Sequence, residues 1–129
     1  HMKETVLLYG FKDQERLKKV KRALLPLGLR MRTVGPEEYF QPVGYLAGVK
    51  EVPPAENDRP GTEFDCEMMV MAGLASAQVD AVIHALCRSG VGRIDYKAVL
   101  TPVNQFWDGE KLYEEIAREH EAMTKGGSQ

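Results

Sequence analysis

Cysteine and tryptophan are scarce in this chain of 129 residues, which contains two cysteines and one tryptophan. Two cysteines are too few for a disulfide scaffold, and Cys66 and Cys87 lack the close spacing of a zinc site. We therefore expect both thiols to be buried and to pack as small apolar groups. The sequence also lacks an apolar run of the roughly 20 residues that cross a bilayer, and it lacks a secretory signal. These absences predict a cytoplasmic protein that has no membrane partner.

An excess of one charge is missing as well, because 17 Lys+Arg stand against 19 Asp+Glu. This balance gives no overall attraction for nucleic acid. The segment 12–32 is nevertheless basic, with eight Lys or Arg residues against two acidic ones, which is typical of a solvated helix face. The length suits one domain, expected over residues 3–125, with His1-Met2 as a cloning scar and 126–129 as a frayed tail.

Apolar patterning predicts four strands and three helices. The continuous run Thr5–Tyr9 indicates a strand that is buried on both sides, whereas the other strands show alternation. Helical spacing of apolar residues follows three residues that can cap a helix, Asp13, Ser76 and Asp108. The expected order is strand 5–9, a helix from Asp13 to Gly28, strand 29–34, strand 64–72, a helix from Ser76 to Gly90, strand 93–101 and a helix from Asp108.

This repeated β-α-β order predicts an α+β fold, a ferredoxin-like β-α-β-β-α-β sandwich with an additional C-terminal helix. In that sandwich four antiparallel strands carry two helices on one face, and the second and third strands are neighbours. Arg30 and Arg32 would then oppose Asp65 and Glu67 on the outward face. Opposite charges across neighbouring strands contribute about 0.2–1 kcal/mol per pair. A doubly wound sheet is disfavoured, because helices would bury that charged face.

A long insertion, residues 35–63, separates the second and third strands. Its first part is aromatic and costly to leave in water, whereas residues 51–63 have the proline and polar content of a mobile loop. One candidate surface for the aromatic part is the helix-free face of the sheet, which would also serve as the interface of a homodimer. The predicted interface residues are Tyr39, Phe40, Tyr45, Met69 and Met71.

An anion site is a further hypothesis. In the predicted sandwich both helix N-termini emerge at the same end of the sheet, where free backbone N–H groups favour a small carboxylate or phosphate. Ordinary turns and helix caps explain the same residue types, so both interpretations stay open. The candidate ligand-binding residues are Gly10, Phe11, Gly73, Ser76 and Arg93.

Motifs for other chemistry are absent from the sequence. It contains no P-loop, dinucleotide fingerprint or nucleophile elbow, so we expect no catalytic residues and no cofactor. The outward positions of the third strand are acidic or methionine, where RNA-binding domains carry stacking aromatics. A metal site has little support, because His84 and His120 are the only histidines besides His1.

The stretch Lys97-Ala-Val-Leu-Thr-Pro-Val-Asn-Gln-Phe-Trp107, followed by Leu112 and Glu119-His120, resembles the C-terminal signature of a small bacterial family of domains of unknown function. The opening Val6–Phe11 is similar to the start of that family. The family carries a label of amino-acid metabolism without a known reaction, and the resemblance implies no catalytic residue. It directs attention to a polar cluster that would contact a ligand or a subunit: Lys97, Thr101, Asn104 and His120. An ordinary turn between a strand and a helix also explains Thr101 and Asn104, because short polar side chains bond to the backbone there.

From these observations we expect a noncatalytic module that binds a small anionic metabolite or interacts with proteins, including a second copy of itself. The alternative is a small enzyme or ligand sensor in amino-acid metabolism.

Overall fold

The computed structural model describes residues 3–127, so the predicted scar at 1–2 and the last residues of the predicted tail, 128–129, lie outside it. Within this range no helix is both long enough and apolar enough to cross a bilayer. Short 3₁₀ turns occupy Leu25–Leu27, Pro36–Glu38 and Asn104–Phe106. The main elements are β1 (Thr5–Tyr9), α1 (Gln14–Leu24), β2 (Arg30–Val34), α2 (Val43–Ala47), β3 (Met68–Ala72), α3 (Ser76–Arg88), β4 (Tyr96–Val99) and α4 (Gly109–Gly127).

The four strands form one mixed sheet in the order β2-β1-β3-β4. β1 pairs in parallel with β2, and β3 pairs in parallel with β4. The two central strands are antiparallel, so that Thr5 lies opposite Ala72 and Tyr9 lies opposite Met68. The molecule therefore consists of two β-α-β units that meet through their first strands.

The mixed architecture agrees with the predicted α+β class, but the predicted neighbourhood of the second and third strands is wrong. The two strands that flank α1, β1 and β2, pair with each other, and so do the two strands that flank α3, β3 and β4. β1 therefore lies between β2 and β3. The predicted cross-strand charge pairs do not form. Arg32 instead binds Glu38 (Nη2–Oε2, 2.7 Å), and Glu67, which precedes β3, binds Arg16 (Nε–Oε2, 2.7 Å).

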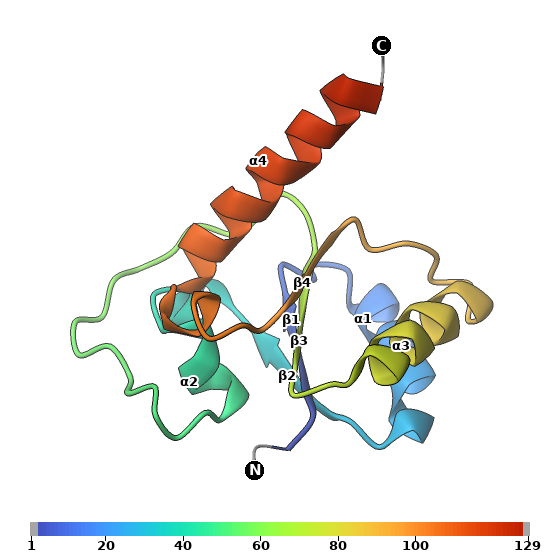
Figure 1. The fold of residues 1–129 in the computed structure, drawn as a ribbon, viewed down its shortest axis with the longest axis horizontal. Coiled ribbons are helices and arrows are strands. Elements are labelled where there is room, and N and C mark those ends of the chain that lie inside the picture. Colours follow the sequence, from blue (N-terminus) through green and yellow to red (C-terminus); the bar gives the residue numbers. More distant parts are fainter. Residues whose placement is uncertain (1–2, 128–129) are drawn as a thin grey trace.

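Helices cover both faces of the sheet, which corrects the expectation of helices on one face (Figure 1). α1 and α3 lie on one side, and α2 and α4 lie on the other. The physical reason is the composition of the central strands: every residue of β1 and of β3 is buried. A strand that is apolar on both faces is stable only when both faces are covered.

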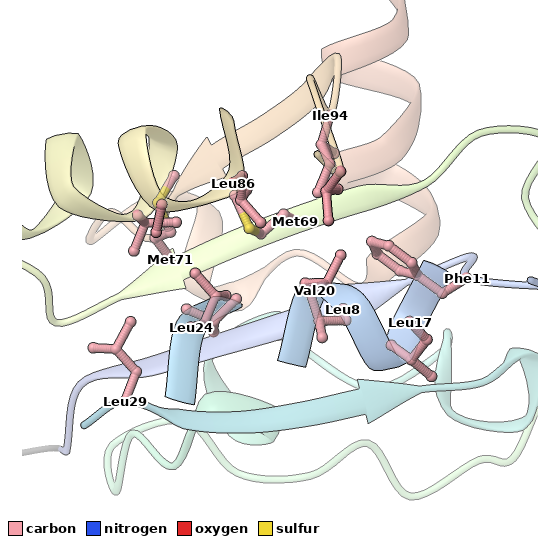
Figure 2. Close-up of a cluster of buried hydrophobic side chains, with 14 residues drawn as sticks. Leu8, Phe11, Leu17, Val20, Leu24, Leu29, Met69, Met71, Leu86 and Ile94 are labelled. Atoms are coloured by element: carbon pink, nitrogen blue, oxygen red, sulfur yellow. The ribbon is translucent and has the colours of Figure 1, made fainter. Parts of the chain in front are cut away.

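The first core lies between the sheet and the helices α1 and α3 (Figure 2). Asp13 begins α1 as predicted, because its Oδ1 accepts from the backbone N–H groups of Glu15 (3.0 Å) and Arg16 (3.2 Å). Met69 and Met71 point from β3 into this core and are 0% and 2% exposed. They therefore do not form the predicted interface. The apolar stripe of α1 that meets them is Leu17, Val20 and Leu24.

The second core lies on the opposite face, where the 35–63 connection and α4 cover Met68 and Val70. The connection covers the face of the sheet that α1 and α3 leave open. The faces predicted for the β3 residues are reversed, because Met69 and Met71 face α1 and α3 whereas Met68 and Val70 face the connection. Tyr39 is fully buried in this core, so it is not an interface residue either. Phe40 is half-buried and Tyr45 is 39% exposed. A homodimer through an open sheet face is therefore not compatible with this fold.

The start of α4 follows the predicted pattern, whereas the start of α3 does not. Asp108 Oδ1 accepts from the backbone N–H of Lys111 (2.8 Å), as expected for a helix cap. The residue that precedes α3 is Ala75 instead of Ser76, and its backbone N–H donates to Oε1 of Gln78 (2.7 Å). The side chain of Gln78 therefore caps α3 in place of the predicted Ser76.

The hydroxyl of Tyr9 offers a test of the second core. It is buried and has no hydrogen-bond partner among the described residues, and burial, followed by the charge of Glu38, raises its pKa. Removing an unsatisfied buried polar group is neutral or stabilising, so Tyr9→Phe should raise the free energy of unfolding by between zero and about 1 kcal/mol. Urea denaturation measures the change.

Tyr39→Phe is the matched control, because the Tyr39 hydroxyl donates to Glu63 (2.5 Å). Losing this bond should lower the free energy of unfolding by about 1 kcal/mol. An equal loss in the two variants would contradict the described surroundings of Tyr9.

Candidate functional site

A hollow of about 340 Å³ opens at the end of the sheet where β1 leads into α1, and we call it the β1-end pocket. The strand directions explain its position. Because β1 is antiparallel to β3 and β3 is parallel to β4, the end of β1 and the starts of β3 and β4 lie together. The segments that flank these three strand ends supply the lining. It consists of Gly10, Lys12, Asp13, Asp65, Cys66, Glu67, Arg93, Ile94 and Asp95.

Gly10 packs against the protein's own backbone on one side of the pocket. Its φ is +74°, and a Cβ atom at this position would lie 2.7 Å from the carbonyl oxygen of Cys66. The glycine is therefore needed for the close approach of the segment before β3. This contact accounts for the glycine without the ligand-binding role that the sequence predicts for Gly10.

Two ion pairs hold the walls of the pocket. Arg16 binds Glu67 and also donates from Nη1 to the carbonyl oxygen of Val91 (2.8 Å), so it joins α1 to both other walls. Arg93 binds Asp95 at the surface (Nε–Oδ1, 3.1 Å). The first pair links α1 to the segment before β3, and the two pairs together use four of the charges near the hollow.

Lys12 and Asp65 are the remaining charges of interest. Both side chains are exposed and line the pocket, and neither forms an ion pair with any side chain between residues 3 and 124. Asp13 is already engaged with the start of α1. The pocket thus presents one unpaired cation and one unpaired anion to a ligand.

Cys66 adds an exposed thiol to the lining, and Cys87 is also exposed, so the predicted burial of both thiols is wrong. β3 begins only at Met68, which leaves Cys66 outside the sheet. The backbone N–H of Cys66 donates to the hydroxyl of Tyr113 (3.0 Å). Burial raises the pKa of Tyr113 to about 12, so this hydroxyl is protonated at neutral pH.

An aromatic stack supports the segment that carries Asp65 and Cys66. The ring of Phe64 lies between those of Tyr39 and Tyr113, with centroids 4.0 Å away on each side. Tyr39 belongs to the long connection and Tyr113 to α4. The stack therefore ties the pocket wall to the layer that covers the second face of the sheet.

The structure separates the residues of the predicted anion site. Gly10 and Arg93 line the β1-end pocket, but Gly73 and Ser76 follow β3 and lie at the other end of the sheet, since β1 and β3 are antiparallel. Phe11 is buried in the first core. Two N-terminal donors of α1, the backbone N–H groups of Glu15 and Arg16, are also taken, because Asp13 accepts from them. The expected meeting of two helix N-termini is therefore wrong.

The predicted polar cluster is brought together in part. Lys97, Thr101 and Asn104 border a hollow of about 280 Å³ beside β4 and α4, whereas His120 packs on the ring of Tyr96 (centroids 5.3 Å apart). Thr101 and Asn104 bond to each other's backbone N–H groups, Asn104 Oδ1 at 2.8 Å and Thr101 Oγ1 at 3.0 Å. Turn chemistry thus accounts for these two residues.

Sequence reasoning missed the two unpaired charges, Lys12 and Asp65. The sequence pattern places Lys12 in the basic segment 12–32 and Asp65 in the predicted strand 64–72. The available signal was the polar run Asp65-Cys66-Glu67 directly before an unbroken apolar segment, which marks a strand entrance rather than a strand. For metals, no group of three or more His, Cys, Asp and Glu side chains within the described residues is placed to hold an ion.

Comparison with known protein families places part of the chain near an uncharacterised domain. Residues 67–123 match the model of a family described as a domain of unknown function, DUF3783. This segment spans β3, α3, β4 and most of α4, and it supports the expected similarity to an uncharacterised domain family. Neither the curated proteins nor the solved structures give a significant match to the chain. Lys12 and Asp65 lie outside the matched segment, so the pocket combines it with the first β-α-β unit.

Gly10 and Gly28 allow the close backbone contact at the pocket to be measured. Both have nearly the same positive φ, +74° and +72°, but a Cβ at Gly28 meets nothing within 4 Å. Gly28→Ala therefore reports the cost of the conformation alone, about 1 kcal/mol. Gly10→Ala should cost at least about 1 kcal/mol more, because Cys66 must also shift. Equal losses in denaturation would show that the described contact with Cys66 is absent.

Proposed function

We propose that this protein is a noncatalytic module that binds a small zwitterionic ligand of the amino-acid class in the β1-end pocket. The observation that carries the proposal is the pair of unpaired opposite charges, Lys12 and Asp65, on one hollow of about 340 Å³. A ligand carboxylate would bind Lys12, and a ligand ammonium would bind Asp65.

The balance of charge favours a zwitterion over the simple anion that we expected from the sequence. Four carboxylates line the pocket, against the two cations Lys12 and Arg93 in the lining. Arg16, which is not part of the lining, neutralises Glu67, so one negative charge remains in excess. A phosphate would meet this excess of negative charge directly, which is unfavourable at short range. An ammonium group on the ligand changes the sign of that interaction. The four carboxylates are Asp13, Asp65, Glu67 and Asp95.

The size of the pocket supports a small ligand. Ligand pockets are commonly about 300–1,000 Å³, and a volume of about 340 Å³ lies at the lower end of that range. Such a volume suits a molecule of amino-acid size better than a nucleotide.

The arrangement around Cys66 favours binding over catalysis. Nucleophilic catalysis by a thiol needs an oriented base within hydrogen-bond reach. Neither His84 nor His120 is among the residues that line the β1-end pocket. The exposed thiol is nevertheless the one observation in favour of the alternative, a small enzyme of amino-acid metabolism.

Titration of the ¹⁵N-labelled protein with individual L-amino acids, followed by amide chemical shifts, tests the proposal. We expect shifts at Gly10, Asp65 and Cys66, and Asp65→Asn should weaken the affinity about tenfold by removing a charge-assisted hydrogen bond. Asp80→Asn is the matched control, because Asp80 is exposed on α3 and does not line the pocket. It should leave the affinity unchanged.

Acetate and methylamine separate the two halves of the proposed ligand. Each carries one of the charges, so each should bind much more weakly than the zwitterion. Acetate binding as tightly as every amino acid would contradict the proposal in favour of a simple anion site. The absence of shifts around Gly10 with all amino acids would contradict it altogether.

A further inference from the structure

A third hollow, of about 260 Å³, lies between α3 and β4, and we call it the α3–β4 pocket. Its walls are mostly apolar, and two basic side chains stand among them. No carboxylate is part of its lining, in contrast to the β1-end pocket. The lining residues are Ile83, Leu86, Cys87, Gly92, Arg93, Ile94 and Lys97.

Lys97 reaches this pocket because of its position in the sheet. Lys97 on β4 lies opposite Met69 on β3. The side chain of Met69 points toward α1 and α3, and residues that pair across two strands share one face of the sheet, so Lys97 faces the same side. Its Nζ donates to the carbonyl oxygen of Ile94 (2.6 Å). No carboxylate forms an ion pair with Lys97 anywhere in the described part of the chain.

Among the described residues no carboxylate is close enough to Lys97 to pair with it, although Asp95 acts on it from a distance. Burial, followed by the positive charge of Arg93, lowers the pKa of Lys97, and the negative charge of Asp95 opposes this only in part. Arg93 itself is paired with Asp95 at the exposed side of the loop. A carboxylate between the two cations would relieve their repulsion and satisfy the remaining donors of the Lys97 ammonium.

The apolar side of the pocket also has an uncovered surface. Ile83 is 37% exposed although it belongs to the apolar stripe of α3, and it borders the pocket beside Leu86 and Ile94. A hydrocarbon group in the hollow would remove this surface from water. The pocket therefore presents an apolar wall and a cationic rim to the same ligand.

We infer that the α3–β4 pocket binds a small apolar carboxylate, with its hydrocarbon part against Ile83, Leu86 and Ile94 and its carboxylate on Lys97 and Arg93. This inference is independent of the proposed zwitterion site. The two pockets share Arg93 and Ile94, so they lie on the two sides of one loop. Their linings nevertheless select different ligands, because only the β1-end pocket carries acidic groups for an ammonium.

Amide-shift titration with 4-methylpentanoate tests the inference, with 4-methylpentanamide as the uncharged analogue. We expect shifts at Ile83, Cys87 and Lys97 on addition of the acid, and binding at least about tenfold weaker for the amide. Lys97→Met keeps the length of the side chain and should weaken binding of the acid by a similar factor. Lys50→Met is the matched control, since Lys50 is exposed in the long connection and does not line the pocket.

Ile83→Gln provides a second variant, at a position of α3 that is 37% exposed and outside the two cores, so the protein should still fold. It should weaken binding of the acid while leaving the amide spectrum of the core unchanged. Binding that is equal for acid and amide, or unaffected by both Lys97→Met and Ile83→Gln, would overturn the inference. Shifts confined to Gly10 and Asp65 would assign the acid to the other pocket and would likewise overturn it.

Discussion

The antiparallel contact between β1 and β3 is the constraint on which the other features of this molecule depend. It joins two β-α-β units, and it sends α1 and α3 away from opposite ends of the sheet. It also places the end of β1 beside the starts of β3 and β4, which creates the β1-end pocket. A parallel contact between the same strands would bring the two helix N-termini together and would separate Lys12 from Asp65.

Burial of both central strands accounts for the remaining layers. α1 and α3 cover one face, and the second face needs an equal cover because Tyr9, Met68 and Val70 point into it. The long connection and α4 provide that cover, so they are part of the core and not appendages to it. The stack of Tyr39, Phe64 and Tyr113 connects this cover to the wall of the pocket. Stability of the second core and geometry of the site are therefore physically linked.

The sequence was sufficient for the local elements but insufficient for their neighbours. Apolar spacing located β1, α1 and α3, and Asp13 and Asp108 marked two helix starts, because these signals depend on residues close together in the chain. Strand order depends on contacts between distant segments, and several orders bury the same residues. The run Met68–Ala72 is apolar at every position, and the polar residues that suggest alternation, Asp65 and Glu67, lie before the strand, so the faces predicted from them are reversed. Asp65 and Lys12 come together only through that strand order, and for this reason the unpaired charges of the site were not predicted.

Interstrand nuclear Overhauser effects between β1 and β3 test the central claim most directly. The antiparallel register predicts backbone contacts of Thr5 with Ala72, Leu7 with Val70 and Tyr9 with Met68. Contacts of Thr5 with Met68 would indicate a parallel arrangement. Such contacts, or direct contacts between β2 and β3, would contradict the architecture and both pockets that depend on it.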